Sequence, residues 1–349
     1  MTPIEQDAQE VIGNLSDEVL QALAGKRLLL TGAAGFLGTH WVEVLRVLNC
    51  GPLKETPMTI LATDLRLNGG TISTVKMNGI TFREWDVRND LSGGLVEADF
   101  IVHLAGIASP QWYRKDPLLA LDVAVQGTRN CLKIARECGA RILVFSSSEI
   151  YGNPPADQIP TKETYRGYVS SMGPRACYDE SKRLAETLCY IYHDFYGVST
   201  GIVRPFNVYG PGMKQKDYRM MPNMAGHILR GEPIKVYGDG LQTRTFTYVT
   251  DAMNGFIRAL VLGRPGEVYN IGQPDPEVNM TQLIRECEAA IGLSIPHECV
   301  AYPSEYPQDE PRRRCPDITK AREDLGYVPT VPLGEGFRRF FAWAKEVYT

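Results

Sequence analysis

The sequence lacks several features that define particular classes of protein. No run of apolar residues approaches the length needed to cross a bilayer. Lys and Arg number 37 against 41 Asp and Glu, so the chain has no excess of positive charge for nucleic acid or an anionic membrane. The eight cysteines form no C-x-x-C pair, and no cluster of His and Cys suggests a metal site. We therefore expect reduced thiols and no binding of metal, nucleic acid or membrane.

A secretion signal is also missing, because residues 1–19 are acidic and have neither a basic start nor an apolar core. We expect a cytoplasmic protein in which residues 1–25 form a helical extension before the first strand. Hydrophobic residues make up 44% of the chain and charged residues 22%, as in ordinary globular proteins. The length of 349 residues fits a large domain with an appended lobe.

Short apolar strands alternate with helical patterns over residues 26–210. The predicted strands include 26–32, 58–64, 99–106, 141–148 and 199–210. Helical apolar spacing occurs between strands at 36–48 and 118–138. Apolar strands separated by helices are typical of a parallel sheet that is covered on both faces. The predicted fold class is therefore α/β, a Rossmann-like doubly wound parallel sheet that forms the NAD-binding domain.

The pattern changes after residue 210, where Gly, Pro and short β segments mix with brief helices. We interpret residues 211–349 mainly as a smaller C-terminal substrate-binding lobe, with some segments that return to the first domain. No internal repeat or low-complexity linker separates the two regions. They are expected to pack into one continuous body.

The stretch "TGAAGFLG" places Gly32, Gly35 and Gly38 between the first strand and the following helix. Glycine permits a tight turn and the close approach of backbone to a pyrophosphate, which the helix N-terminus also attracts. A turn that serves geometry alone is the alternative, but the strand–turn–helix context favours a dinucleotide. Asp64 ends the second strand, where its carboxylate can bind ribose hydroxyls and repel the extra phosphate of NADP. NAD is therefore the predicted cofactor, although Arg66 nearby leaves NADP open.

Other predicted cofactor contacts lie at the start of the same helix and at the ends of later strands. One short strand ends near a carboxylate that could contact the edge of the adenine. The small residues of "HLAG" could let the phosphates and ribose of the cofactor pass close to the backbone. These predicted contacts are Phe36, Leu37, Asp86, Val87, Leu104, Ala105, Gly106 and Pro205.

The stretch "GPRACYDESKRLAET" places Tyr178 one helical turn before Lys182, so both side chains can face the same ligand. A free phenol has a pKa of about 10 and is a poor base at neutral pH, but a nearby ammonium favours the phenolate. The tyrosine could then remove a proton from a sugar hydroxyl while hydride leaves the same carbon for the nicotinamide. This spacing is common by chance on exposed helices. Ser147 in "FSSSEIYG" supports it, because a hydroxyl at that edge of the sheet could share the proton.

Together these motifs resemble the extended short-chain dehydrogenase/reductase family, specifically its nucleotide-sugar epimerases, dehydratases and decarboxylases. The resemblance rests on "TGAAGFLG", "HLAG", "FSSSEIYG", "YDESK", "RPFNVYGPG", "YGDGLQTRTFTYVTDA" and "YNIG", in the family's order over about residues 26–345. Within the family, "GPRACYDESKRLAET" and "PRRRCPDITKAREDLGYVP" are most similar to the UDP-glucuronate decarboxylases. The resemblance implies an NAD-dependent enzyme that oxidises C4 of UDP-glucuronate, releases carbon dioxide and forms UDP-xylose.

The resemblance also implies roles for individual residues. Tyr178 is the base, Lys182 lowers its pKa, and Ser147 and Glu149 complete the catalytic group. Ser148 stands where the family's dehydratases carry an Asp, which disfavours 4,6-dehydration. The implied substrate-binding residues are Tyr113, Ser148, Asn207, Arg219, Arg244 and Arg314.

The four charged residues among these have different implied tasks. Arg244 and Arg314 would hold the nucleotide diphosphate with their bidentate guanidinium groups, and Arg219 would lie near the glucuronate carboxylate. Glu149, or a water that it orients, would assist reprotonation of the sugar at C5. Structural roles remain as alternatives: surface ion pairs for Arg244 and Arg314, an exposed loop for Arg219 and a turn cap for Glu149.

Some positions depart from the decarboxylase pattern, namely Val208, Gly212 and Lys214. A nucleotide-sugar 4-epimerase, or another enzyme that forms a 4-keto sugar, is therefore the alternative function. A non-catalytic NAD-binding relative is a third possibility that fits less well, because Tyr178 and Lys182 are both present. The family commonly dimerises through a four-helix bundle, and the apolar surface of 118–138 and 178–196 is compatible with a homodimer.

Overall fold

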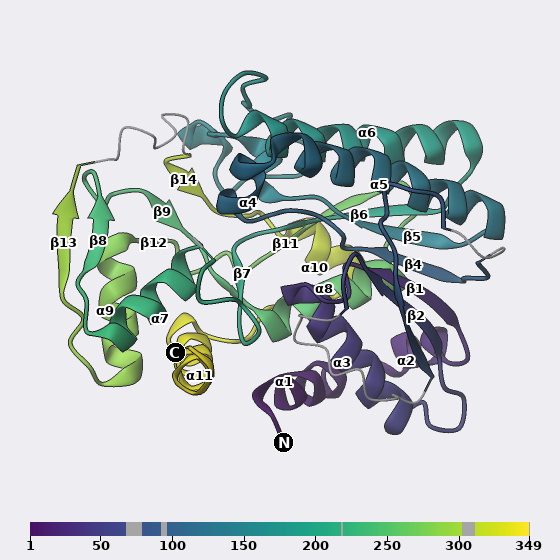
Figure 1. The fold of residues 1–349 in the computed structure, drawn as a ribbon, viewed down its shortest axis with the longest axis horizontal. Coiled ribbons are helices and arrows are strands. Elements are labelled where there is room, and N and C mark those ends of the chain that lie inside the picture. The colour runs from purple at the N-terminus through teal and green to yellow at the C-terminus, as the bar shows by residue number, and fades with distance from the viewer. Residues whose placement is uncertain (68–78, 92–95, 218, 302–310, 349) are drawn as a thin grey trace.

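The computed structural model describes the chain except for residues 68–78, 92–95, 218, 302–310 and 349. A parallel sheet of seven strands crosses the larger part of the molecule, in the order β11-β6-β5-β4-β1-β2-β3 (Figure 1). Its strands are β1 (Arg27–Thr31), β2 (Thr59–Asp64), β3 (Ile80–Glu84), β4 (Phe100–His103), β5 (Arg141–Phe145), β6 (Thr200–Pro205) and β11 (Val268–Ile271). The strand order reverses beside β1, which is where doubly wound sheets bind their ligands.

Helices cover both faces of this sheet (Figure 1). One face carries α5 (Pro117–Cys138) and α6 (Ala176–Tyr196), and the other carries α3 (Phe36–Cys50) and α8 (Val249–Val261). Alternate residues of each strand serve the two layers, because successive side chains point to opposite faces. In β1, Leu29 packs in the core below α5 and α6, whereas Leu28 and Leu30 join the core that includes α3 and α8. The predicted Rossmann-like fold is confirmed.

The segments beyond residue 210 build most of a smaller lobe, at the left of Figure 1. Its short strands are β8 (Ile234–Tyr237), β9 (Thr243–Arg244), β12 (Val278–Asn279), β13 (His297–Val300) and β14 (Arg313–Arg314). Its helices are α7 (Met220–Arg230), α9 (Met280–Ile291) and α11 (Leu333–Val347). Two later elements lie at the main sheet, since α8 covers it and β11 pairs with β6. The division of the chain at residue 210 stays a prediction.

Several shorter elements complete these two parts. They are α4 (Pro110–Lys115), η1 (Ser148–Tyr151), η2 (Ala156–Gln158), β7 (Val208–Tyr209), β10 (Thr247–Tyr248) and α10 (Thr319–Leu325). The two-stranded sheet of β7 and β10 lies next to the point where the chain leaves β6. Backbone from both parts of the molecule therefore converges at the carboxyl ends of the main strands.

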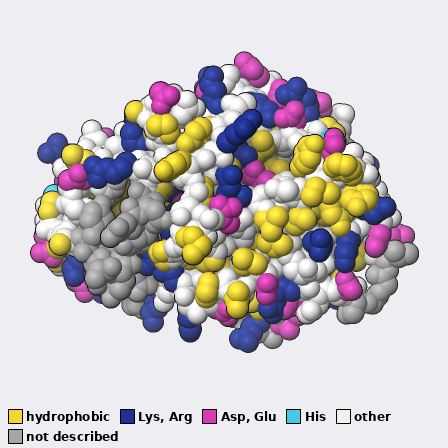
Figure 2. All heavy atoms as spheres, turned by 90° about the horizontal axis from the view of Figure 1, so that it is seen from above, with side chains coloured by type: hydrophobic (Ala, Val, Ile, Leu, Met, Phe, Trp, Pro, Cys, Tyr) yellow, Lys and Arg dark blue, Asp and Glu magenta, His cyan; other side chains and the backbone are white. Residues whose placement is uncertain are grey.

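The outer face of α5 and α6 carries many uncovered apolar side chains. Figure 2 looks onto this face and shows hydrophobic side chains gathered across it. The exposed apolar residues on the two helices are Leu118, Leu121, Leu184, Tyr190, Phe195 and Tyr196. Among the described residues, no helix is both long and apolar enough to cross a membrane, and no cluster of His, Cys, Asp or Glu has the makings of a metal site.

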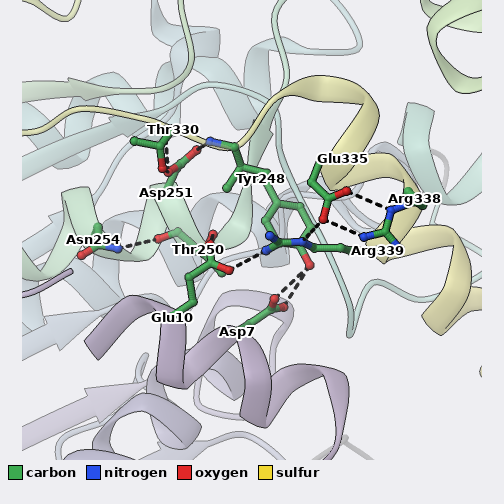
Figure 3. A network of polar contacts seen from close by, with 11 residues as sticks. Asp7, Glu10, Tyr248, Thr250, Asp251, Asn254, Thr330, Glu335, Arg338 and Arg339 are labelled. Atoms are coloured by element: carbon green, nitrogen blue, oxygen red, sulfur yellow. Dashed lines mark hydrogen bonds and ion pairs between the residues drawn. The ribbon is translucent and has the colours of Figure 1, made fainter. Parts of the chain in front are cut away.

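Residues 1–25, where a helical extension is predicted, contain α1 (Pro3–Gly13) and α2 (Asp17–Leu23). A capping box formed by Thr2 and Glu5 begins α1. Figure 3 shows how polar side chains fix this helix to the C-terminal part of the chain. The hydroxyl of Tyr248 donates to Asp7 at 3.0 Å, and Glu10 pairs with Arg339 of α11 at 2.6 Å. The extension is thus bonded to segments more than 200 residues away in the chain.

Candidate active site

The glycine turn after β1 is built for close backbone contact. Gly32 has φ of 73°, and a Cβ on it would lie 2.7 Å from the backbone nitrogen of Ala105. A Cβ on Gly38 would lie only 2.0 Å from the carbonyl oxygen of Gly32. Gly35 precedes α3 without a side-chain cap, so the first N–H groups of this helix face the turn. This cradle fits a pyrophosphate, and "HLAG" lies directly against it, as expected for a dinucleotide site.

Asp64 links the second strand to this turn. Its Oδ2 accepts from the backbone nitrogen of Ala34 at 2.9 Å, and its Oδ1 accepts from that of Leu65 at 2.7 Å. The carboxylate is therefore held at the strand end, where a ribose would be bound. Asp86 follows β3, but Arg88 forms a bidentate pair with it and holds the pKa of this carboxyl below its usual range. Contacts of Asp64 with ribose and of Asp86 with adenine remain predictions.

The predicted catalytic residues come together at the carboxyl end of β5. Tyr178 is only 8% exposed and hydrogen-bonds to the side chain of Ser147. Nζ of Lys182 donates to the carbonyl of Phe145 at 2.7 Å and lies 5.9 Å from the centre of the Tyr178 ring. The ring of Tyr113 stacks on that of Tyr178 with the centroids 5.3 Å apart. The phenol is thus fixed in a buried position beside the serine.

The glycine of "HLAG" connects the catalytic group with the cofactor cradle. A Cβ on Gly106 would lie 3.4 Å from Nζ of Lys182. The ammonium therefore sits beside the backbone segment that also packs on the glycine turn. Pro205 is the last residue of β6, and Phe36 and Leu37 are the first residues of α3. These positions agree with a cofactor that runs from the glycine turn towards Tyr178.

Several neighbouring groups act on the pKa of Tyr178. Burial raises the pKa to about 12, the hydrogen bond from Ser147 lowers it, the charges of Glu149 and Asp179 raise it, and Arg219 lowers it. Lys182 is not among these largest influences, and burial lowers its own pKa to about 8. The sequence-based expectation that Lys182 lowers the pKa of Tyr178 in the working enzyme stays a prediction. A further positive charge is needed near the ring to make Tyr178 a base at neutral pH.

Glu149 lies in a buried group of charged side chains. Arg314 forms a bidentate ion pair with Glu149, from Nη1 to Oε1 at 2.6 Å and from Nη2 to Oε2 at 2.7 Å. Arg175 donates to the same Oε2. Burial alone would raise the pKa of this carboxyl, but the charges of Arg314, Arg175 and Arg244 outweigh burial and hold the pKa below its usual range. Glu149 is therefore held as a carboxylate. Its part in reprotonation at C5, either directly or through a water that it orients, stays a prediction.

The other predicted substrate residues surround this centre. Ser148 is buried next to Glu149, and Asn207 donates to the carbonyl of Thr245 at 2.8 Å. Asn207 is the one non-glycine residue with positive φ, 41°, in the described part of the chain, which marks a constrained backbone. Arg219 forms a bidentate pair with Asp217 and lies over the ring of Phe36.

Arg244 donates hydrogen bonds to backbone carbonyls. Its guanidinium donates to the carbonyl of Thr243 at 2.8 Å and to that of Pro311 at 2.8 Å. Beside Tyr113, a pocket of about 410 Å³ is lined by Arg114, Pro117, Gly173, Pro174 and Cys177. Whether Arg244 reaches a diphosphate stays a prediction.

Several buried polar atoms around this centre have no hydrogen-bond partner within the described ranges of the chain. They are Oγ of Ser146, Oγ1 of Thr245 and Nε of Arg314. An unpaired buried polar atom is costly, so such atoms commonly face a bound ligand or water. Arg314 in particular keeps a donor available for an anion while it holds Glu149. The residues present fit a polar, anionic substrate next to the dinucleotide cradle.

The sequence interpretation missed the charged neighbours that organise this centre. Arg175 was part of the quoted motif but received no role, although its side chain is only 8% exposed and also lies 3.6 Å from Asp179. The available signal was the position of this arginine, three residues before the candidate base and inside the same motif. Asp217, which pairs with Arg219, gave no signal beyond its proximity in the chain.

The fold and the site define a Rossmann-fold enzyme that uses NAD. Comparisons with known proteins agree with this class. The family model described as "NAD dependent epimerase/dehydratase family" matches residues 28–272, and the chain belongs to this family. The resemblance drawn from the motifs is confirmed, and NAD is the cofactor.

Individual curated relatives and solved structures are similar to this chain over most of its length. UDP-glucuronic acid decarboxylase 5 of Arabidopsis thaliana is 40% identical over 311 residues, which cover 89% of this chain and 86% of the relative. UDP-glucuronic acid decarboxylase 1 of Xenopus tropicalis is 38% identical over 92% of this chain and 72% of the relative. The UDP-glucuronic acid 4-epimerase of Bacillus cereus, solved with UDP-glucuronic acid and NAD, has a TM-score of 0.76 and 28% identity, covering 92% of this chain and 100% of that chain.

Proposed function

We propose that this protein is an NAD-dependent decarboxylase that converts UDP-glucuronate into UDP-xylose. The observation that carries the proposal is the buried Tyr178–Ser147 pair beside several arginines, which suits a sugar with both a carboxylate and a diphosphate. The 40% identity to a UDP-glucuronic acid decarboxylase over 89% of the chain supports the same reaction.

The first half of the reaction is an oxidation at C4 of the sugar. When bound, NAD supplies the hydride acceptor and a positively charged ring near the substrate. Tyr178 takes the proton of the C4 hydroxyl, and Ser147 keeps the phenol oxygen oriented through its hydrogen bond. The positive charges around the phenol compensate for its burial. The sugar then carries a ketone at C4, and its C5 carboxylate belongs to a β-keto acid.

The second half releases carbon dioxide. The C5–C6 bond breaks, its electron pair passes into the ketone, and an enolate forms at C4 and C5. Protonated Tyr178 and Ser147 donate hydrogen bonds to the enolate oxygen. Because Glu149 is ionised, its task is to orient a water that delivers the proton to C5. Hydride then returns to C4 and Tyr178 returns its proton to the oxygen, so the substrate has exchanged carbon dioxide for one proton.

Arginines account for the recognition of the two anionic groups. Arg219 lies close enough to lower the pKa of Tyr178, so it is positioned to hold the glucuronate carboxylate near the reacting carbon. Arg314 and Arg244 would bind the diphosphate, as the family resemblance implies. The unpartnered Nε of Arg314 supports this assignment.

A 4-epimerase is the second candidate, because the solved UDP-glucuronic acid 4-epimerase has the same fold over 92% of this chain. It would share the oxidation at C4 and then return hydride to the other face of the ketone. The two functions differ in one observable property of the product, the carboxylate at C6.

Incubation of the purified protein with UDP-glucuronate, followed by mass spectrometry and NMR of the nucleotide sugar, tests the proposal. We expect UDP-xylose and release of carbon dioxide, with little UDP-4-keto-pentose. Tyr178→Phe removes the proton acceptor and is expected to lower turnover by about 100-fold or more. Recovery of UDP-galacturonate with its carboxylate intact would instead establish the epimerase.

A homodimer that packs α5 and α6 against their copies is the proposed assembly. The apolar residues on this face, shown in Figure 2, support it, since exposed apolar patches on soluble proteins commonly mark interfaces. These two helices from each subunit would form a four-helix bundle. The candidate active site lies at the start of α6, so the assembly would also stabilise the helix that carries Tyr178.

A further inference from the structure

Arg175 occupies a central position that the proposed mechanism has not used. It immediately precedes α6, and its carbonyl accepts from the backbone nitrogen of Tyr178 at 2.9 Å. Its guanidinium bonds to Oε2 of Glu149 and lies 3.6 Å from a carboxylate oxygen of Asp179. One side chain therefore connects the strand end that carries Glu149 with the helix that carries Tyr178.

Glu149 is held from two directions. Arg175 belongs to the same helical segment as the candidate base, whereas Arg314 comes from β14 in the smaller lobe. Arg314 is also the residue expected to bind the diphosphate, and its Nε is buried without a partner in the described part of the chain. A diphosphate would compete with Glu149 for this guanidinium, because both are anions that match its fork. In the proposed reaction Arg175 does not bind the diphosphate, so it keeps its contact with Glu149.

We propose that Arg175 is a positioning residue that holds the Glu149 carboxylate beside Tyr178 when the substrate diphosphate draws Arg314 away. This inference rests on the proposed decarboxylation and adds a residue to it. Arg175 touches no reacting atom; it acts through Glu149, which orients the water that protonates C5. The rigid guanidinium plane suits this task, since it can bond to Glu149 and face Asp179 at the same time.

The charges around Glu149 predict how the pH dependence of kcat changes when Arg175 is replaced. Three cations act on this carboxylate, namely Arg175, Arg314 and Arg244. The other titratable groups nearby are Tyr178 and Asp179 of α6 and Tyr113 of α4. Removing the charge of Arg175 leaves Glu149 with fewer cations against the cost of its burial, so its pKa rises. The acid limb of kcat, where Glu149 becomes protonated, should then move to higher pH.

Steady-state kinetics of the NAD-loaded protein with UDP-glucuronate test the proposal over a range of pH. Arg175→Gln is expected to lower kcat by on the order of 100-fold, with the acid limb moved to higher pH and KM changed less than about threefold. Because protonation at C5 is slowed, more of the enolate should leave the site unprotonated and take its C5 proton from solvent, which gives free UDP-4-keto-pentose. Arg175→Lys keeps the charge and should restore part of kcat and most of the pH profile.

The double variant separates positioning from folding. If Arg175 acts through Glu149, adding Arg175→Gln to Glu149→Gln should change kcat and its pH profile little further. Arg338→Gln removes an exposed arginine of α11 that pairs with Glu335 and serves as the control with an unchanged pH profile. Bound NAD and the melting temperature are measured for every variant.

Two results would overturn the inference while leaving the proposed function intact. One is an Arg175→Gln variant with wild-type kcat and pH profile; the other is additive losses in the double variant. If Arg175→Gln does not fold, Arg175→Lys and the double variant still test the positioning role. An Arg175→Lys variant that keeps neither part of kcat nor the wild-type pH profile contradicts that role. Wild-type protein that fails to decarboxylate UDP-glucuronate overturns the proposed function itself, so the two failures are distinguishable.

Discussion

Gly38 shows what the glycine cradle requires of a single residue. A Cβ at this position would lie 2.0 Å from the carbonyl oxygen of Gly32, and backbone cannot move aside as a flexible side chain can. We expect Gly38→Ala to lose most of its bound NAD and to lower the free energy of unfolding by about 1–3 kcal/mol. Chromatography of released NAD and thermal melting measure the two effects.

Gly13 is the matched control for this substitution. It lies in α1, and a Cβ there meets nothing within 4 Å. Gly13→Ala should therefore keep wild-type NAD content and stability. A Gly38→Ala protein that purifies with as much NAD as the Gly13→Ala protein would contradict a pyrophosphate cradle at this turn.

At the residue scale, local patterns were predictable from the sequence and distant partners were not. The glycine turn and the Tyr178–Lys182 pair are each formed by residues close together in the sequence. Their motifs therefore predicted where in the fold they lie. Glu149 and Arg314 are 165 positions apart, and only the folded chain brings them together. The burial that raises the pKa of Tyr178 could not be predicted either, because segments from several elements produce it.

At the scale of elements, α1 carries a titratable contact to the rest of the molecule. Burial raises the pKa of Asp7 to about 7, the hydrogen bond from Tyr248 lowers it, Glu10 raises it and Arg339 lowers it (Figure 3). The folded chain therefore binds a proton here that the unfolded chain releases near pH 4, so stability falls as pH rises from about 4 to about 7. Asp7→Asn stays neutral and should remove this fall. Each unit of pKa difference is worth about 1.4 kcal/mol, so the variant should gain stability over wild type on the order of a few kcal/mol at pH 8.

Denaturant unfolding at pH 5 and pH 8 measures this difference. The amide oxygen of the variant can still accept from the hydroxyl of Tyr248, so the contact itself is kept. Asp17→Asn, at an exposed position of α2, is the control and should leave the pH dependence of wild type. Parallel losses of stability with pH in the wild type and in Asp7→Asn would show that Asp7 does not carry the effect.

The elements themselves followed the sequence closely. Strands β1, β2, β4, β5 and β6 all lie within the predicted ranges, because apolar runs bounded by turns and helices are a local signal. The capping box of Thr2 and Glu5 is local too, and α1 forms where a helix is predicted. The docking of α1 on Tyr248 and Arg339 could not be predicted, since no local pattern specifies which distant surface a helix will cover.

At the scale of the whole molecule, the exposed face of α5 and α6 carries the last prediction. Leu184 is 46% exposed and Phe195 70% exposed on α6, and neither is covered within the described chain. In the proposed dimer these side chains are buried against the partner, so a charge there costs desolvation. We expect light scattering to give about twice the 38.9 kDa of one chain for the wild type, and a monomer for Leu184→Glu combined with Phe195→Glu. Leu293→Glu, at a 50% exposed position just after α9, should stay dimeric. A wild type that remains monomeric at high concentration would contradict the assembly, and circular dichroism of the double variant separates dissociation from unfolding.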